Sequence, residues 1–250
     1  MRQNRNNLWL YLKIIGNKKL NRYQSKKFIT FILMFPPFIE MPLTYVFSGL
    51  IILLSIIGFY YKPLYNKLVY HPFEVFRGNR IHTLFTSIFL HKNWMHLLFN
   101  IYLLYIMSKD IEYIILEKNY SQVQIKLIWF FVLAFGTVSV NLVTGWIYRK
   151  DVSHTTIGAS GIAFAFTAFS ILYLPLDHLK RKHKFIPLYY GYEIFLAFLI
   201  IFVCLMFIYR KNSKSNHKAH FFGLIIGSLL AIVFRPTLIT EIIYHLKSRW

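Results

Sequence analysis

The sequence predicts an all-α membrane protein built from about six transmembrane helices. Three observations favour this class: 56% of the residues are hydrophobic, only 15% are charged, and the apolar residues gather in long runs. A soluble domain usually has about a quarter of its residues charged, whereas a helix that crosses a bilayer needs roughly 20 apolar residues. The 250 residues therefore leave room for about six spans and no separate soluble domain.

The expected elements follow the apolar runs in chain order. Residues 1–41 form a basic cytoplasmic tail, in which 28–39 is interfacial because Pro36 and Pro37 break a stretch too short to span. Spans are expected at about 42–61, 96–107, 125–146, 158–174, 192–209 and 219–234. The second span is extended upstream by 83–90 and follows a connection, 62–82, that folds on the membrane surface. The spans define a membrane domain over 42–234, and 235–250 form a short C-terminal tail.

The formal charge of +20 narrows the classes of partner. The apolar runs leave no polar surface on a soluble core, which argues against binding to nucleic acid. The basic residues lie between the spans, where they face anionic lipid and set the orientation; attraction of an acidic substrate is the open alternative. With both termini cytoplasmic, 18 of the 29 Lys and Arg residues lie on the cytoplasmic side, as the positive-inside rule favours. The single cysteine, Cys204, allows no disulfide within the chain.

Polar groups within or at the ends of apolar spans are costly in lipid unless they face the bundle interior or a wet cavity, so a functional role is the default hypothesis for them. Ser160 lies in the sequence Gly158-Ala159-Ser160-Gly161, which opens the fourth span. The unpaired N–H groups and the dipole of a first helical turn favour negative charge, as the oxyanion of acyl transfer requires. Ser160 is therefore a candidate nucleophile, and the alternative is a serine that packs at a helix crossing.

A second polar group, His220, opens the sixth span. His220, Gly223 and Gly227 share one helix face because they are spaced i, i+3 and i+7. Small residues on such a face bring two helix backbones together, so His220 is expected against a neighbouring helix, and the helix with Ser160 is the candidate. Histidine is the usual base for a serine nucleophile; the alternative is a hydrogen-bonded packing histidine.

A third motif, His91-x4-His96-x3-Asn100, enters the second span. His96 and Asn100 are spaced i, i+4 on one face, and both side chains can donate hydrogen bonds to an oxyanion. A metal site is disfavoured because His91 and His96 are five residues apart and no His-Glu-x-x-His sequence is present. We therefore expect neither a metal nor another cofactor.

Taken in this order, the three motifs resemble the rhomboid family of intramembrane serine proteases. The resemblance extends from about residue 42 to residue 234 and implies a six-transmembrane-helix, rhomboid-like bundle with an active site open to the extracytoplasmic side. It implies a dyad of Ser160 and His220 without a third carboxylate. It also implies an oxyanion hole formed by His96, Asn100 and the N–H group of Ser160.

The resemblance extends to supporting residues. Phe164 stands where the family often has a tyrosine below the catalytic histidine, and His82-Thr83 stands where a Trp-Arg pair is common. Glu112 falls where the family often has a glutamate at the end of the second span. The residues expected to be structural near the site are His91, Gly158, Gly161, Gly223, Gly227 and Phe164.

The predicted function is that of a hydrolase, an intramembrane serine endopeptidase. Its expected substrates are single-pass transmembrane proteins, cleaved near the extracytoplasmic face of the lipid bilayer. The expected location is the inner membrane of a bacterial cell, as a multi-pass protein with both termini in the cytoplasm. The alternatives are a catalytically inactive rhomboid-like protein that binds membrane clients and a small transporter, although the sequence shows no inverted repeat.

Overall fold

The computed structural model describes residues 36, 38–114, 121–174, 190–208 and 217–248. The chain divides into two compact units, Met1–Glu40 and Met41–Trp250. In the first unit the described part is essentially one short 3-10 turn, η1 (Phe38–Glu40). The expected basic tail and most of the expected interfacial segment therefore lie outside the described residues.

The second unit is all-helical within the described residues, apart from an isolated bridge between Tyr70 and Thr156. Its elements are α3 (Pro42–Tyr60), α4 (Lys62–Leu68), α5 (Pro72–Val75), α6 (Thr83–Thr86), η2 (Ser87–Phe89), α7 (Trp94–Lys109), η3 (Asp110–Ile114), α8 (Gln122–Tyr148), α9 (Ser160–Tyr173), α10 (Gly191–Ile208), α11 (His217–Phe234) and α12 (Leu238–Lys247).

Four of the described helices, α3, α8, α10 and α11, are long and apolar enough to cross a membrane. Helices α7 and α9 have 16 and 14 residues. At 1.5 Å per residue α9 is about 21 Å long, shorter than a hydrocarbon core of roughly 30 Å. The all-helical membrane fold is thus confirmed, and the count of six spans stays a prediction.

The expected upstream extension of the second span is wrong. Leu90 has extended backbone angles, and Asn93 caps a new helix by accepting a hydrogen bond from the N–H of His96 at 2.8 Å. An asparagine in this position satisfies one of the unpaired donors of a first turn. Helix α7 therefore begins at Trp94, and 83–89 form the separate short helices α6 and η2.

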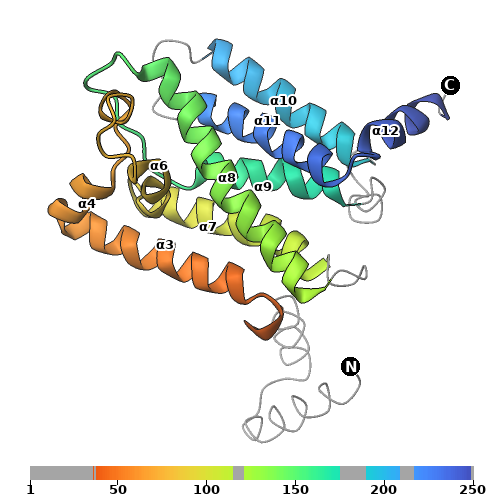
Figure 1. Ribbon diagram of the computed structural model, residues 1–250, viewed down its shortest axis with the longest axis horizontal. Coiled ribbons are helices and arrows are strands. Elements are labelled where there is room, and N and C mark those ends of the chain that lie inside the picture. The colour runs from red at the N-terminus through yellow and green to blue at the C-terminus, as the bar shows by residue number, and fades with distance from the viewer. Residues whose placement is uncertain (1–35, 37, 115–120, 175–189, 209–216, 249–250) are drawn as a thin grey trace, which may run out of the picture. The chain divides into compact units, whose positions relative to one another are not determined.

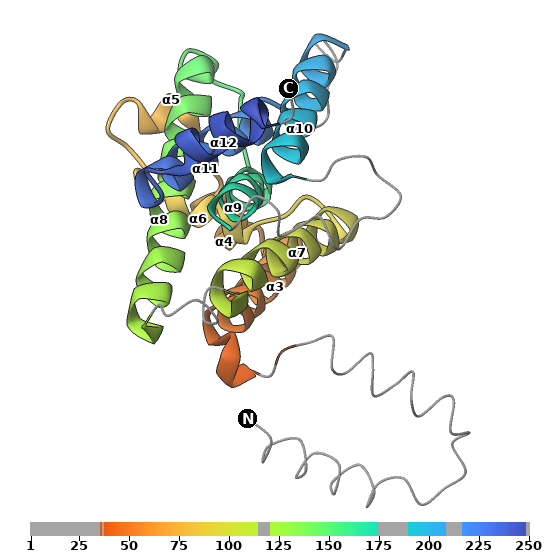
Figure 2. The same ribbon diagram turned by 90° about the vertical axis from the view of Figure 1, so that its right-hand side faces the viewer.

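Helix α9 lies in the middle of the second unit, with α7, α8, α10 and α11 around it (Figures 1 and 2). All its residues except Ser160 and Ile171 are buried. Its closest neighbour is α11, because a Cβ atom on Gly227 would lie only 2.1 Å from the carbonyl oxygen of Ala165. The glycine face of α11 is therefore what lets the two helix backbones touch.

The two ends of α9 are held differently. At its C-terminus, Arg235 donates hydrogen bonds to the carbonyl oxygens of Leu172, Tyr173 and Leu174 at 3.3, 3.0 and 2.6 Å. These carbonyls would otherwise lack partners at the helix end. Arg235 is also paired with Glu241 on α12, a helix that lies within the expected C-terminal tail. The N-terminal end carries the candidate site.

The first N–H donors within helix α3 are satisfied by one side chain. Pro42 has no N–H group, and the next two, of Leu43 and Thr44, donate to the two carboxylate oxygens of Glu112 at 2.8 Å each. The Thr44 hydroxyl donates to the same carboxylate at 2.6 Å. Glu112 is 2% exposed and lies on η3, a π-helical turn at the end of α7. The glutamate thus fixes the start of α3 to the end of α7.

Candidate active site at the start of helix α9

Ser160 is the first residue of α9, and the backbone before it is sharply turned. Gly158 has φ +108°, a conformation that favours glycine, and its N–H donates to the carbonyl of Ser87 at 3.1 Å. A Cβ atom at Gly158 would lie 2.6 Å from Cε1 of His96. The His96 ring therefore packs directly against the backbone two residues before Ser160.

His91 holds Ala159, the residue between Gly158 and Ser160, in place. Its Nε2 accepts a hydrogen bond from the N–H of Ala159 at 3.3 Å, and its Nδ1 lies 2.8 Å from the hydroxyl of Ser55. Because Ser55 donates its own proton to the carbonyl of Phe89 at 2.7 Å, Nδ1 of His91 must be the donor to Ser55. Burial, aided by the nearby His96, lowers the pKa of His91 to about 3. The ring is therefore neutral, with one fixed tautomer.

His220 lies between α9 and α10. Its ring centroid is 4.8 Å from that of Phe164, one turn after Ser160, and 5.5 Å from that of Phe202. A Cβ atom on Gly223, one turn further along α11, would lie 2.3 Å from the carbonyl oxygen of Gly161. Within the described residues the Ser160 hydroxyl and the His220 ring are not hydrogen-bonded to each other. The structure thus places the two side chains on helices in direct contact, without a bond between them.

Asn100 is completely buried on α7, and neither polar atom of its side chain has a hydrogen-bond partner in the described part of the chain. Leaving a buried donor unsatisfied usually costs about 1–3 kcal/mol, so such a group calls for an explanation. Helix α7 packs against α9. His96, one turn earlier, accepts a weak hydrogen bond at Nδ1 from the N–H of Lys92, at 3.5 Å.

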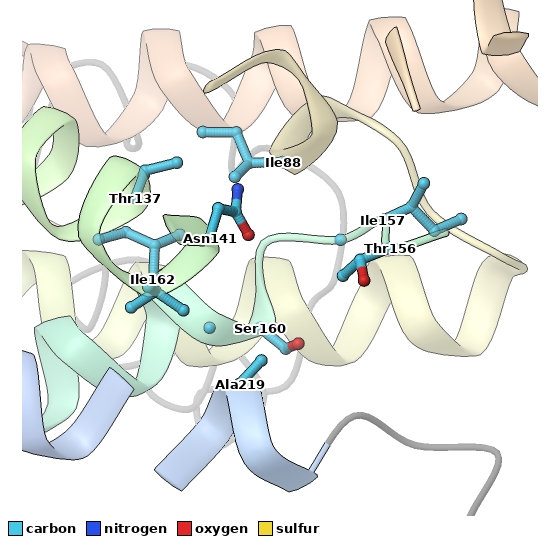
Figure 3. Close-up of a pocket in the computed structure, with 11 residues that line it drawn as sticks. Ile88, Thr137, Asn141, Thr156, Ile157, Ser160, Ile162 and Ala219 are labelled. Atoms are coloured by element: carbon cyan, nitrogen blue, oxygen red, sulfur yellow. The ribbon is translucent and has the colours of Figure 1, made fainter. Parts of the chain in front are cut away.

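A small cavity adjoins Ser160. Its volume is about 20 Å³, which is room for about one water molecule. Figure 3 shows Ser160 and Ala219 facing each other on one side, with Thr137 and Asn141 of α8 across the cavity. The buried hydroxyl of Thr137 has no partner in the described residues. The cavity therefore offers polar groups next to the serine.

Several supporting residues were not expected from the sequence. Asn141 donates to the carbonyl of Leu84 at 2.7 Å and to the hydroxyl of Ser87 at 3.2 Å. Tyr70 donates to the backbone carbonyl of Asn141 at 2.9 Å. These bonds join the segment before α7 to α8, and Ser87 in turn accepts from the N–H of Gly158, in the turn before Ser160. An asparagine inside the apolar run 125–146 was a signal that could have identified this support.

An aromatic and basic cluster lies beside the turn before α9. The Tyr148 ring stacks on His154 at 3.7 Å, and the ammonium of Lys218 lies 4.8 Å from the Tyr148 centroid. Burial lowers the pKa of His154, against the opposing effect of the nearby Asp151. The cluster ties the end of α8 to the first turn of α11, just before His220.

One of the comparisons with known proteins identifies a family for this chain. The family model for the Rhomboid domain matches residues 78–237. A search of curated proteins found no match. Among the residues that the structure describes, no three His, Cys, Asp or Glu side chains gather where they could hold a metal ion. The match covers well over half of the chain and includes every predicted site residue, so the chain belongs to the rhomboid family and is a multi-pass membrane protein.

Proposed function

We propose that this protein is an intramembrane serine endopeptidase, with Ser160 as nucleophile and His220 as general base. The observation that carries the proposal is the contact between α9 and α11 at Gly223 and Gly227. It brings a histidine on one helix beside the first turn of another, where a serine meets unpaired N–H groups. A serine needs such a base to attack a peptide carbonyl.

The dyad works in two steps. His220 takes the proton of Ser160 as the hydroxyl attacks the carbonyl carbon, and then returns it to the leaving amine. Because the Ser160 hydroxyl makes no hydrogen bond within the described residues, it is free to turn toward the ring. Catalytic hydrogen bonds are often long before substrate binds. The Phe164 and Phe202 rings limit how far His220 can tilt.

A role in an oxyanion hole explains why the buried side-chain amide of Asn100 has no hydrogen-bond partner in the described residues. We assign its amide, the Nε2 proton of His96 and the Ser160 N–H as donors to the developing oxyanion. Since Nδ1 of His96 accepts from Lys92, the neutral ring carries its proton on Nε2, on the edge that faces Gly158. Donors left without partners in the resting protein become satisfied in the transition state, which is how preorganised donors lower a barrier.

The supporting residues fix the nucleophile in place. His91 orients the N–H of Ala159 through a neutral ring whose other nitrogen donates to Ser55. The cavity beside Ser160 can supply the water that hydrolyses the acyl-enzyme. The proposed substrates are single-pass transmembrane proteins cleaved near the extracytoplasmic face. The proposed location is the bacterial inner membrane, with both termini in the cytoplasm.

The decisive experiment is cleavage of a transmembrane reporter by the full chain in detergent. Ser160→Ala should abolish cleavage without changing the thermal midpoint, and Ser228→Ala is the matched control because that hydroxyl bonds a carbonyl of its own helix. His220→Ala should be equally damaging, and the double variant no worse, since residues that act as one unit lose nearly everything at the first deletion. Full activity in Ser160→Ala would overturn the proposal.

A fluorophosphonate probe separates an enzyme from an inactive client-binding relative. The wild type should be labelled at Ser160, and Ser160→Ala should not. A folded wild type that neither reacts with the probe nor cleaves the reporter would identify the inactive relative instead.

A further inference from the structure

A second, larger cavity is not lined by Ser160, although His91 forms part of its wall. Its volume is about 400 Å³, and it opens between the end of α3, the start of α4 and the residues that lead into α7. Aromatic rings form much of its wall: Phe59, Tyr60, Tyr65 and Trp94. Phe59 and Trp94 touch, with ring centroids 5.2 Å apart, so α3 and α7 close one end of the cavity.

The charged side chains that line this cavity are all positive. Lys62 and Lys92 line it, and none of the described residues around it is acidic. Neither lysine has an ion-pair partner within the described residues, and Lys62 lies 5.3 Å from the Tyr65 centroid. The neutral His91 adds no charge. Two ammonium groups beside aromatic rings therefore form a site for an anion that also has apolar parts.

The apolar part of such a ligand has a surface to follow. Leu50, Leu53, Ile57 and Tyr60 are exposed at i, i+3, i+7 and i+10 on α3, a single stripe that ends at the cavity. On α7 an exposed stripe of Trp94, Leu98 and Tyr102 starts from it. The two helices lie side by side (Figures 1 and 2). Helix α3 is long and apolar enough to cross a membrane, so in a bilayer its exposed stripe faces acyl chains.

We propose that this cavity binds the phosphate headgroup of an anionic phospholipid. Lys62 and Lys92 contact the phosphate, the aromatic rings lie at the level of the glycerol, and the acyl chains follow the exposed stripes of α3 and α7. Tyrosine and tryptophan favour this depth of a bilayer, and basic residues attract anionic headgroups. A lipid fits better than an acidic peptide, because a peptide would need partners for its backbone N–H and C=O groups along apolar stripes that offer none.

Native mass spectrometry of the full chain in detergent tests the site. Phosphatidylglycerol should remain bound to the wild type, and the variant Lys62→Gln with Lys92→Gln should bind it roughly 25-fold more weakly, about five-fold per lysine. The control is Lys67→Gln with Lys150→Gln, which removes two exposed lysines of the same predicted side that do not line the cavity. The control should bind like the wild type, and both variants should keep its thermal midpoint without lipid.

Three further probes decide the chemistry of the ligand. Phosphatidylcholine, which has no net charge, should bind more weakly than phosphatidylglycerol and be insensitive to the lysine pair. Inorganic phosphate alone and a short acidic peptide should not compete with the lipid. Equal binding of phosphatidylglycerol to both double variants would overturn the proposal, and so would full competition by phosphate or by the peptide. Since binding is measured without turnover, the result is independent of whether Ser160 is catalytic.

Discussion

Helices α9 and α10 are neighbours, both strongly apolar, that are packed in opposite ways. Nearly every residue of α9 is buried, whereas α10 buries only Gly191, Tyr192 and Phe202. The difference follows from side-chain size. Helix α9 interleaves small residues with its phenylalanines, and α10 is a run of large ones with Ala197 near its middle. Helix backbones approach closely in a membrane only where side chains are small, so hydrophobicity alone does not tell a core helix from a lipid-facing one.

The candidate site lies at the boundary between the tightly packed α9 and the loosely packed α10. Ser160 belongs to the tightly packed helix, and the His220 ring touches both that helix, at Phe164, and the loosely packed one, at Phe202. The serine side of the site is therefore rigid, while the histidine side borders a helix with few buried contacts. We expect displacement of α10 to cost less than any movement of α9 relative to α11.

The largest difference in stability is expected between two variants that each remove one phenylalanine ring, the first from α9 and the second from α10. Phe169→Ala on α9 deletes a fully buried ring, and such deletions cost about 3–5 kcal/mol. Phe207→Ala on α10 removes a ring that is 74% exposed, and exposed positions usually change stability by less than about 0.5 kcal/mol. Unfolding titrations in mixed micelles measure both. Equal losses would show that α10 is as firmly packed as α9.

The second effect concerns donors on the rigid side of the boundary. Asn100→Ala should lower turnover of the transmembrane reporter by about 10²–10³, equivalent to roughly 2.7–4 kcal/mol, because one oxyanion donor is lost. His96→Ala should behave similarly, and Ser160 should still react with a small electrophilic probe in both variants. Asn66→Ala is the control, since Asn66 is exposed on α4. Wild-type turnover in both variants would make this pair structural.

The third prediction tests the contact that unites α9 and α11. Gly227→Ala places a Cβ atom against the Ala165 carbonyl, while Gly49→Ala adds one where nothing lies within 4 Å. We expect the first to destabilise the protein by about 1–3 kcal/mol, as overpacking does, and also to slow cleavage. The second should be neutral or slightly stabilising, since alanine is the better helix former. The comparison fails if the two substitutions have the same effect.

The smallest effect is expected at the boundary itself. Phe164→Tyr keeps the ring beside His220 and adds a hydroxyl near it, so activity should be retained or modestly raised. Phe164→Leu, which removes the ring, should lower activity below that of Phe164→Tyr and of the wild type. Reporter cleavage by equal amounts of folded protein measures both. Loss of activity in Phe164→Tyr with normal expression would show that the ring has another role.

The sequence was informative where one local pattern determines the structure. Apolar runs located the long helices to within a few residues, and the spacing of His220, Gly223 and Gly227 predicted a face that the structure packs against α9. The motif around Ser160 predicted the start of α9 to within two residues. The family followed from the order of three such motifs, and the family match confirms it.

Features that depend on distant contacts were not predictable in the same way. The break before Trp94 depends on Asn93, whose side chain caps α7 by accepting from the N–H of His96. The role of Asn141 depends on a turn more than 50 residues earlier in the chain. Lys62 and Lys92 are 30 residues apart, and only the packing of α3 on α7 brings them to one cavity.

The bond between the start of α3 and Glu112 has a consequence for biosynthesis. The N–H groups of Leu43 and Thr44 emerge from the ribosome 69 and 68 residues before the carboxylate that accepts from them. Unsatisfied N–H groups cost several kcal/mol in hydrocarbon, so the beginning of α3 should remain at the wet interface until α7 has been inserted. Glu112→Gln replaces one accepting oxygen by a donor, and so should both hinder this step during translation and weaken the finished protein.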